Sequence, residues 1–212
     1  MIEYNKIETL YEREPKTKKL NEGVFRNPTV EYLKDLEWVW TEKIDGTNIR
    51  VCWDGHNMTF GGRTDKAQIP APLVNKLNEY FGGESSAQVF EQTFGNREVI
   101  LFGEGYGAKI QDGGNYISDH VDFILFDIMI NGNYQSRETV VGIANDFGLK
   151  VVPIIGTGTL LEAVLYVKKR PRSFIAQNPN YPMEGLVCRP AMELQDHCGN
   201  RIIVKIKWRD FE

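Results

Sequence analysis

The sequence is poor in cysteine, has no long apolar run and carries no surplus of basic residues, and each lack excludes a class of protein. Its 212 residues include three cysteines, Cys52, Cys188 and Cys198, an odd number with no C-x-x-C pair. A disulfide-stapled secreted domain and a zinc ribbon are therefore excluded. The longest apolar stretch, Val121–Ile130, is interrupted and shorter than the about 18 residues that a membrane-spanning helix needs. Lys and Arg number 25 against 29 for Asp and Glu, and the net charge of −4 excludes a protein that coats nucleic acid by bulk charge.

The same features indicate where the protein works. Three cysteines without a pairing pattern are expected to be reduced thiols, and the charged N-terminal segment does not resemble a signal peptide. We therefore expect a cytoplasmic protein, bacterial or, if viral, in the host cytosol, without a membrane partner. Near the N-terminus, Lys16, Lys18 and Lys19 form a basic cluster. A solvated surface explains such a cluster, and a nucleic-acid contact is the alternative.

Strand patterns outnumber helix patterns along the chain. Aromatic and β-branched residues predict strands at 38–42, 48–53, 58–61, 99–103, 122–130, 185–189 and 201–208. Pro, Gly and capping signals, including a capping box from Thr159 to Glu162, predict helices at about 71–81, 86–94, 137–147 and 160–170. Because the helices do not alternate regularly with the strands, we expect an α+β fold built on antiparallel sheets. We expect a single domain over residues 1–212, with residues 1–35 as an N-terminal extension packed on it.

The last predicted strand places two cations on one face. Alternation puts Ile202, Val204, Ile206 and Trp208 on the apolar face, and Ile203, Lys205 and Lys207 on the other. The two ammonium groups are then held about 7 Å apart, since a strand rises by about 3.4 Å per residue. Such a pair is suited to an anion, although the wet face of an ordinary half-buried strand also carries lysines.

A further lysine ends the first aromatic strand. Lys43 follows an apolar segment, and Gly46 lets the backbone turn just after it. A lysine in such a place is a candidate nucleophile, because a neutral lysine amine can attack an electrophilic carbon or phosphorus. Taken alone, the segment is more typical of a surface lysine before a β-turn.

Six short segments follow one another in a definite order. They are Lys43–Gly46 (K-I-D-G), Gly62–Thr64 (G-R-T), Leu101–Glu104 (L-F-G-E), Phe123–Ile128 (F-I-L-F-D-I), Glu184–Val187 (E-G-L-V) and Val204–Lys207 (V-K-I-K). Together they resemble the motifs of the covalent nucleotidyltransferase superfamily, which comprises ATP-dependent DNA ligases, RNA ligases and mRNA capping enzymes. The RNA ligase 2-like branch is the most similar, and the resemblance extends from about Trp38 to Arg209.

The resemblance implies an ATP-grasp-like nucleotidyltransferase domain, based on antiparallel sheets with flanking helices. It also implies that Lys43 attacks the α-phosphate of ATP to form a covalent lysyl-AMP, that AMP passes to a 5′-phosphate RNA end, and that a 3′-hydroxyl then closes the phosphodiester. ATP and Mg²⁺ (or Mn²⁺) are the implied cofactors, and RNA with those two ends is the implied partner. Relatives usually continue into a C-terminal OB or helical domain, whereas this chain stops at Glu212. We therefore expect a minimal ligase without that domain, or a separate protein that replaces it.

The resemblance assigns roles to individual residues. The implied catalytic residues are Lys43, Glu184, Lys205 and Lys207, with both C-terminal lysines placed to neutralise the α-phosphate. Nucleotide binding is implied for the same three lysines and for Glu42, Arg63, Glu104 and Phe126. Contact with the RNA end is implied for Asn48 and Arg189, and a metal held through water for Glu184 and Asp127.

Phe126 and Asp127 each allow two interpretations. Alternation along their strand puts Ile124, Phe126 and Ile128 on one face and Asp127 on the other. Phe126 is then either a core residue or, as the resemblance implies, an aromatic face stacked on adenine. Asp127 is either the buried partner of a basic side chain or part of the metal and phosphate network.

Two positions bear on the branch of the superfamily. DNA ligases usually carry Arg five residues after the nucleophilic lysine, where this chain has Asn48, and this favours RNA sealing over DNA sealing. The fourth motif of RNA ligases ends in Lys, whereas here Cys188 is followed by Arg189, which keeps the charge but changes its geometry. The alternative functions are a DNA ligase or nick-sealing repair enzyme, and a nucleotide-binding scaffold with reduced catalysis.

Overall fold

A computed structural model describes residues 2–212 of the chain, and these residues divide into two compact units. The first unit consists of residues 2–4, 45–152 and 176–178, and the second of residues 5–44, 153–175 and 179–212. Residues 5–35, which were predicted to form an extension, are part of the second unit and contribute strands to it. The assignment of both units to a single domain stays a prediction.

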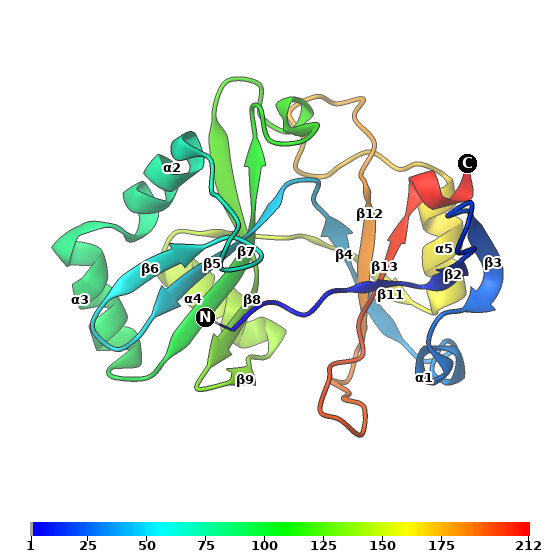
Figure 1. Ribbon diagram of the computed structural model, residues 1–212, viewed down its shortest axis with the longest axis horizontal. Coiled ribbons are helices and arrows are strands. Elements are labelled where there is room, and N and C mark those ends of the chain that lie inside the picture. The colour runs from blue at the N-terminus through cyan, green and yellow to red at the C-terminus, as the bar shows by residue number, and fades with distance from the viewer. Residues whose placement is uncertain (1) are drawn as a thin grey trace. The chain divides into compact units, whose positions relative to one another are not determined.

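The first unit is built on a mainly antiparallel sheet with the strand order β10-β8-β7-β5-β6, and β9 pairs with β8 at its end (Figure 1). The strands are β5 (Thr47–Trp53), β6 (Met58–Gly61), β7 (Val99–Gly107), β8 (Val121–Ile130), β9 (Asn133–Tyr134) and β10 (Lys150–Val151). The pairing of β10 with β8 is parallel, and the other pairings are antiparallel. The longest strands, β7 and β8, had been predicted from their apolar sequence.

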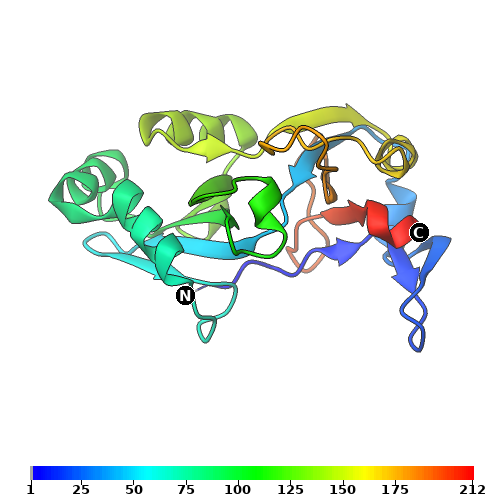
Figure 2. The ribbon, with the colours of Figure 1, turned by 90° about the horizontal axis from the view of Figure 1, so that it is seen from above.

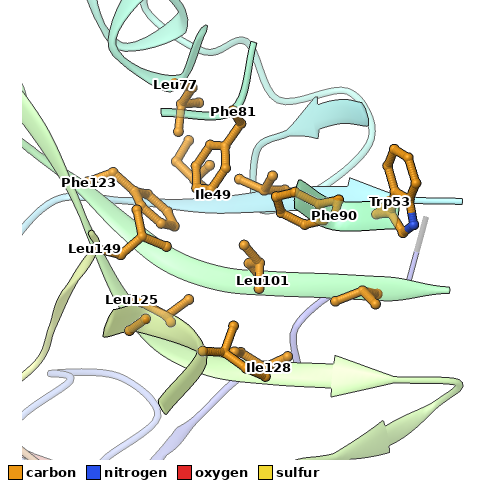
Figure 3. Close-up of a cluster of buried hydrophobic side chains, with 14 of the residues drawn as sticks. Ile49, Trp53, Leu77, Phe81, Phe90, Leu101, Phe123, Leu125, Ile128 and Leu149 are labelled. Atoms are coloured by element: carbon orange, nitrogen blue, oxygen red, sulfur yellow. The ribbon is translucent and has the colours of Figure 1, made fainter. Parts of the chain in front are cut away.

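Three helices cover one face of this sheet and close the first core. They are α2 (Ala71–Phe81), α3 (Gly83–Phe94) and α4 (Arg137–Asp146), and a short 3-10 helix, Gly113–Asn115, follows β7. Figure 3 shows Ile49, Leu101 and Leu125 from three strands in one cluster with Leu77 and Phe81 of α2. Since successive residues of a strand point to opposite faces, the neighbours of these apolar residues lie on the face away from the helices. That second face carries the polar residues with predicted roles.

A β-bulge in β8 corrects the predicted placement of Asp127. The pairing of β7 with β8 places Phe102 opposite Asp127 but Gly103 opposite Leu125, so β8 contains one extra residue at Phe126. Strict alternation would put Phe126 and Asp127 on opposite faces, and this prediction is wrong. Both residues contact Tyr4: its ring lies 5.0 Å from the ring of Phe126, and its hydroxyl donates to the Asp127 carboxylate.

The second unit is built on a sheet with the strand order β1-β13-β12-β4-β11, in which only β1 pairs in parallel with its neighbour. The strands are β1 (Glu8–Thr9), β4 (Trp38–Lys43), β11 (Ile154–Gly158), β12 (Gly185–Pro190) and β13 (Val204–Lys207). A separate antiparallel pair is formed by β2 (Tyr11–Arg13) and β3 (Leu20–Phe25). The remaining elements are α1 (Pro28–Tyr32), α5 (Leu160–Lys168) and a 3-10 helix, η2 (Trp208–Phe211).

Helix α5 packs on this second sheet and closes its core. Figure 2 shows α5 beside β13 and η2. Trp38 and Trp40 of β4 and Leu186 of β12 point into this core, where they meet Val164 and Val167 of α5. The predicted capping box is confirmed at the start of the helix: the Thr159 hydroxyl accepts from the backbone of Glu162, and the Glu162 carboxylate accepts from the backbone of Thr159. Among the helices of residues 2–212, none is long and apolar enough to cross a bilayer.

Candidate active site

Strand register in the second unit brings two predicted catalytic lysines to the same place. Gly185, the first residue of β12, lies opposite Lys43 at the end of β4 and opposite Lys207 at the end of β13. The two lysines therefore flank one glycine, although 164 positions separate them in the sequence (207 − 43). Gly185 has φ +157°, and a Cβ atom there would lie 1.9 Å from the carbonyl oxygen of Ile206. No side chain fits at this position, so glycine lets the three strand ends approach one another.

The carboxylate of Glu184 joins the two lysines. Its Oε2 atom pairs with the Lys43 ammonium and its Oε1 atom with the Lys207 ammonium. The Glu184 side chain is only 7% exposed, whereas the two lysine side chains are 21% and 31% exposed. A nearly buried carboxylate thus holds two cations at a surface that solvent and ligands can reach.

Lys205 adds a third cation on the same face of β13. Val204 and Ile206 lie in the core, as alternation predicted, and Lys205 is half-buried beside the other lysines. Burial lowers the pKa of Lys205, and the neighbouring ammonium groups of Lys207 and Lys43 lower it further. Three ammonium groups around one carboxylate leave an excess of positive charge, which suits a phosphate.

Arg189 lies further along β12, on the same side of the strand as Gly185 and Val187. It is opposite Val39 of β4 and is half-buried. Because residues two apart in a strand share a face, its side chain leaves the sheet on the face that carries Lys43. The second unit therefore gathers the four residues with predicted catalytic roles on one face, together with one residue predicted to contact the RNA end.

Glu42 lies on the other face of β4, and its carboxylate has internal partners. It is 1% exposed, and it accepts hydrogen bonds from the Ser173 hydroxyl and from the backbone N–H of Phe174, the latter at 2.9 Å. Burial raises the pKa of Glu42, and these two hydrogen bonds oppose that shift. The Glu42 side chain thus fixes the segment before β12. Sequence analysis missed Ser173, since no pattern links residues 131 positions apart.

The first unit brings together another part of the predicted residues. Asn48 of β5 lies directly opposite Glu104 of β7, and both side chains are half-buried. Gly46 precedes them, where a Cβ atom would lie 2.3 Å from the carbonyl oxygen of Gly105. The Asn48 Oδ1 atom is buried and accepts no hydrogen bond from any residue in the range 2–212. An acceptor without a partner in the protein is a candidate for a hydrogen bond from a ligand.

Tyr4 organises the two predicted residues of β8. Asp127 is fully buried and accepts a 2.5 Å hydrogen bond from the Tyr4 hydroxyl, while the half-buried Phe126 meets the Tyr4 ring edge-on. The ring of Tyr4 also lies 5.0 Å from that of Phe102. No sequence pattern indicates this contact, because Tyr4 lies in an N-terminal segment without periodicity. The metal role of Asp127 stays a prediction.

Arg63 and the cysteines complete the set of predicted positions. Arg63 is exposed in the turn after β6, two residues before Asp65, which pairs with the buried Arg50. Cys52 and Cys188 are buried and Cys198 is exposed, and all three are free thiols. Within residues 2–212, no group of three or more His, Cys, Asp or Glu side chains has the arrangement of a metal site. A metal ion at Glu184 would therefore have this one carboxylate, and no cluster of such side chains, as its protein ligand in the second unit.

Comparison with known proteins identifies the family. A model of the RNA ligase family matches residues 36–207, which include every predicted site residue. The chain belongs to the RNA ligase family. This membership confirms the resemblance drawn from the six motifs.

Solved structures of an RNA ligase share the fold. One structure of a Naegleria gruberi RNA ligase variant with ATP and Mn matches with a TM-score of 0.69 and 22% sequence identity. The match covers 99% of this chain and 57% of the Naegleria chain. A second variant with ATP and Mn has a TM-score of 0.64 at 22% identity, with 87% of this chain and 52% of the other covered. The same ligase with pyrophosphate has a TM-score of 0.63 at 23% identity, with 87% and 53% covered. The chain thus spans about half the length of these structures, and the predicted α+β fold based on antiparallel sheets is confirmed.

Proposed function

We propose that this chain is an ATP-dependent RNA ligase that forms a covalent lysyl-AMP at Lys43. The observation that carries the proposal is the Glu184 carboxylate bound between Lys43 and Lys207 at the ends of three strands of the second sheet. A protein that only bound nucleotides would need cations for the phosphates. It would not need a partly buried lysine amine held among further cations at a strand end.

The residues present fit a nucleotide and a divalent metal ion. Structures of the Naegleria gruberi RNA ligase contain ATP with Mn, AMP with Mn, or pyrophosphate. In this chain, Lys43, Lys205 and Lys207 provide positive charge for phosphate oxygens, and Glu184 provides the carboxylate oxygens that Mg²⁺ or Mn²⁺ prefers. Glu184 would hold such an ion through water, and the bound ion would neutralise charge on the phosphates. Separately, Asp127 of the first unit is proposed to hold a metal ion through water.

Lys43 acts as the nucleophile in the first step. Its Nζ atom forms a bond to the α-phosphorus of ATP, the bond from that phosphorus to the bridging oxygen breaks, and pyrophosphate leaves with the electron pair. The amine must first give up a proton and separate from the Glu184 carboxylate, with which it is paired. Lys205 and Lys207 would neutralise the charge that develops on the α-phosphate oxygens.

Further predicted residues are proposed to act in the later steps. AMP would pass from Lys43 to the 5′-phosphate of an RNA, and a 3′-hydroxyl would then displace AMP to form the phosphodiester. Asn48, with its unsatisfied acceptor, and Arg189 are proposed to contact the RNA end. The proposed nucleotide contacts are Glu104 to the ribose hydroxyls, Phe126 to the adenine face, Arg63 to ribose or phosphate, and Glu42 through the segment that it fixes.

The first test is covalent labelling. Purified protein is incubated with α-labelled ATP or GTP and Mg²⁺ or Mn²⁺, denatured, and separated by size. We expect label from ATP on the wild type and none on Lys43→Ala, because no other group replaces the amine. Lys34→Ala, which removes a lysine paired with Asp35 outside the site, is the control and should label like the wild type. Wild-type protein that takes no label would instead support a binding scaffold.

The second test separates RNA from DNA as the substrate. Pre-adenylated RNA and DNA strands of the same sequence bypass the first step and report the sealing step alone. We expect faster sealing of RNA, since Asn48 occupies the position where DNA ligases usually have Arg. Sealing of DNA alone would favour the nick-sealing DNA ligase.

A further inference from the structure

Two arginines lie over one tryptophan at the end of the catalytic strand. The guanidinium carbon of Arg170 is 3.9 Å from the centre of the Trp208 ring, and that of Arg209 is 5.4 Å from it. Both distances are within the about 6 Å over which a cation is attracted to an aromatic face. Trp208 is half-buried and the two arginine side chains are exposed. The stacking therefore holds two planar cations in place at the surface.

Backbone hydrogen bonds tie this cluster to the active site. Trp208 directly follows Lys207, and its N–H donates to the carbonyl oxygen of Glu184 at 3.3 Å. The N–H of Met183 donates to the carbonyl oxygen of Pro171 at 2.9 Å, next to Arg170. The segments that carry the two arginines thus both join the segment that carries Glu184. The cluster is therefore linked through the backbone to the segment of Glu184, while the Trp208 ring packs on the core that α5 closes.

The backbone of Arg170 is held in an uncommon conformation. Its φ of +52° lies in the left-handed region, which few residues other than glycine adopt, and Pro171 follows it. Arg170 follows Lys169, the C-cap of α5, and a left-handed residue at this position commonly ends a helix, so the end of α5 fixes where the Arg170 side chain begins. The Arg170 guanidinium has an ion-pair partner in Glu212 at 3.7 Å, but both side chains are more than half exposed. Such an exposed pair is weak, so an incoming anion can replace Glu212.

The cluster is suited to phosphate esters. The planar guanidinium group matches two oxygens of a phosphate, and stacking on an aromatic ring orients it before the ligand arrives. Lys43, Lys205 and Lys207 already supply cations for the reacting phosphate, and Arg170 and Arg209 extend the positive charge beyond it. Two further cations on segments joined to that of Glu184 fit a ligand with repeated negative charges, such as a nucleic-acid backbone. We propose that Arg170 and Arg209, oriented by Trp208, bind backbone phosphates of the RNA next to the end that is joined. This inference rests on the proposed function.

Alanine variants of the two arginines test the proposal. In Arg170→Ala/Arg209→Ala, we expect the KM for pre-adenylated RNA to rise about tenfold, while self-adenylation with ATP stays within about twofold of the wild type. The dependence of RNA binding on salt should weaken by about 1.4 in the slope of log K against log salt, since each phosphate contact on a single strand contributes about 0.7. Lys169→Ala is the matched control, because it removes one exposed cation beside Arg170 that does not contact Trp208.

Two further variants examine the stacking itself. Trp208→Phe keeps an aromatic face and should retain most of the RNA affinity, while Arg170→Lys keeps the charge but loses the planar contact and should bind RNA more weakly. An unchanged KM for RNA in the double variant would overturn the proposal, and so would a rise confined to the KM for ATP, which would place β- and γ-phosphates at the cluster. Anisotropy of a labelled 5′-phosphorylated RNA measures binding directly. It therefore tests the cluster even if the wild type fails to adenylate or seal.

Discussion

At the scale of single residues, Glu184 is the residue whose substitution tests the proposed site most directly. Its carboxylate neutralises two lysines, and an amide of the same size cannot do so. In Glu184→Gln, we expect the rate of lysyl-AMP formation to fall by about 10²–10³-fold, the range found when one charged or donor group of a preorganised site is removed. The rate is measured with labelled ATP in a single turnover, with circular dichroism to show that the fold is retained.

A matched change elsewhere makes this result interpretable. Glu193→Gln alters an exposed carboxylate in the loop after β12, and its labelling rate should equal that of the wild type. If Glu184→Gln also formed lysyl-AMP at a rate within threefold of that of the wild type, the ion pairs at Glu184 would be structural. The catalytic role that we propose for this carboxylate would then be wrong.

The contacts of individual residues differ in how far they could be predicted from the sequence. The approach of Lys43 to Lys207 follows from strand register, which no local pattern contains, and it was expected only because the motif order resembled a known family. The contact of Glu42 with Ser173 and that of Tyr4 with Asp127 were not expected. Each joins a strand residue to a residue in a segment without periodicity, and such pairings are set by the tertiary structure alone.

At the scale of elements, helices and strands were predicted correctly where a local sequence pattern has a strong physical cause. The Thr159 capping box predicted the start of α5, aromatic and β-branched residues predicted β4 and β12, and apolar alternation predicted the burial pattern of β13. The short strands β1, β2, β3 and β11 were missed, because two to six residues with few apolar positions carry little periodic signal. The bulge at Phe126 was missed for a related reason: one extra residue changes the face of the following side chains without changing the apolar character of the strand.

The capping box of α5 gives a prediction at this scale. Thr159→Ala removes the hydroxyl that accepts from the Glu162 backbone, and it should lower the free energy of unfolding of the second unit by about 1 kcal/mol. Urea denaturation followed by circular dichroism measures this change. Thr159→Ser preserves the hydroxyl and should be close to the wild type. Equal losses in both variants would mean that the methyl group, and not the cap, stabilises the helix.

At the scale of the whole molecule, each unit has its own hydrophobic core. The first core joins its sheet to α2, α3 and α4, and the second joins its sheet to α5. Trp53 belongs to the first core, whereas Trp38 and Trp40 belong to the second. Because tryptophan fluorescence reports local packing, Trp53→Phe reports the unfolding of the second unit alone, and the difference between the wild type and this variant reports the unfolding of the first unit.

This separation allows a test of acid stability in the first unit. Asp122 is 4% exposed and accepts hydrogen bonds from Lys150 and Tyr80, each at 2.8 Å, and from the backbone of Phe123. Burial alone would raise the pKa of Asp122, but these hydrogen bonds to the carboxylate outweigh it and hold the pKa below its ordinary value. A carboxyl group with a lowered pKa in the folded state stabilises the fold above its unfolded pKa of about 3.9. That stabilisation is lost as the pH falls through the folded value.

We therefore expect Asp122→Asn to lower the stability of the first unit by about 1–3 kcal/mol at pH 7, because the amide leaves the hydrogen bonds of a buried site incompletely satisfied. The difference between variant and wild type should begin to shrink below about pH 4, where the unfolded chain binds a proton at this position, and should level off once the pH falls below the lowered pKa of the folded state. Urea unfolding at a series of pH values measures both effects, with Asp146→Asn as the control for an exposed aspartate. A difference that stays constant from pH 7 to pH 3 would show that Asp122 acts through shape and not through charge. Lys150, whose side chain is 62% exposed, would then contribute little to the fold.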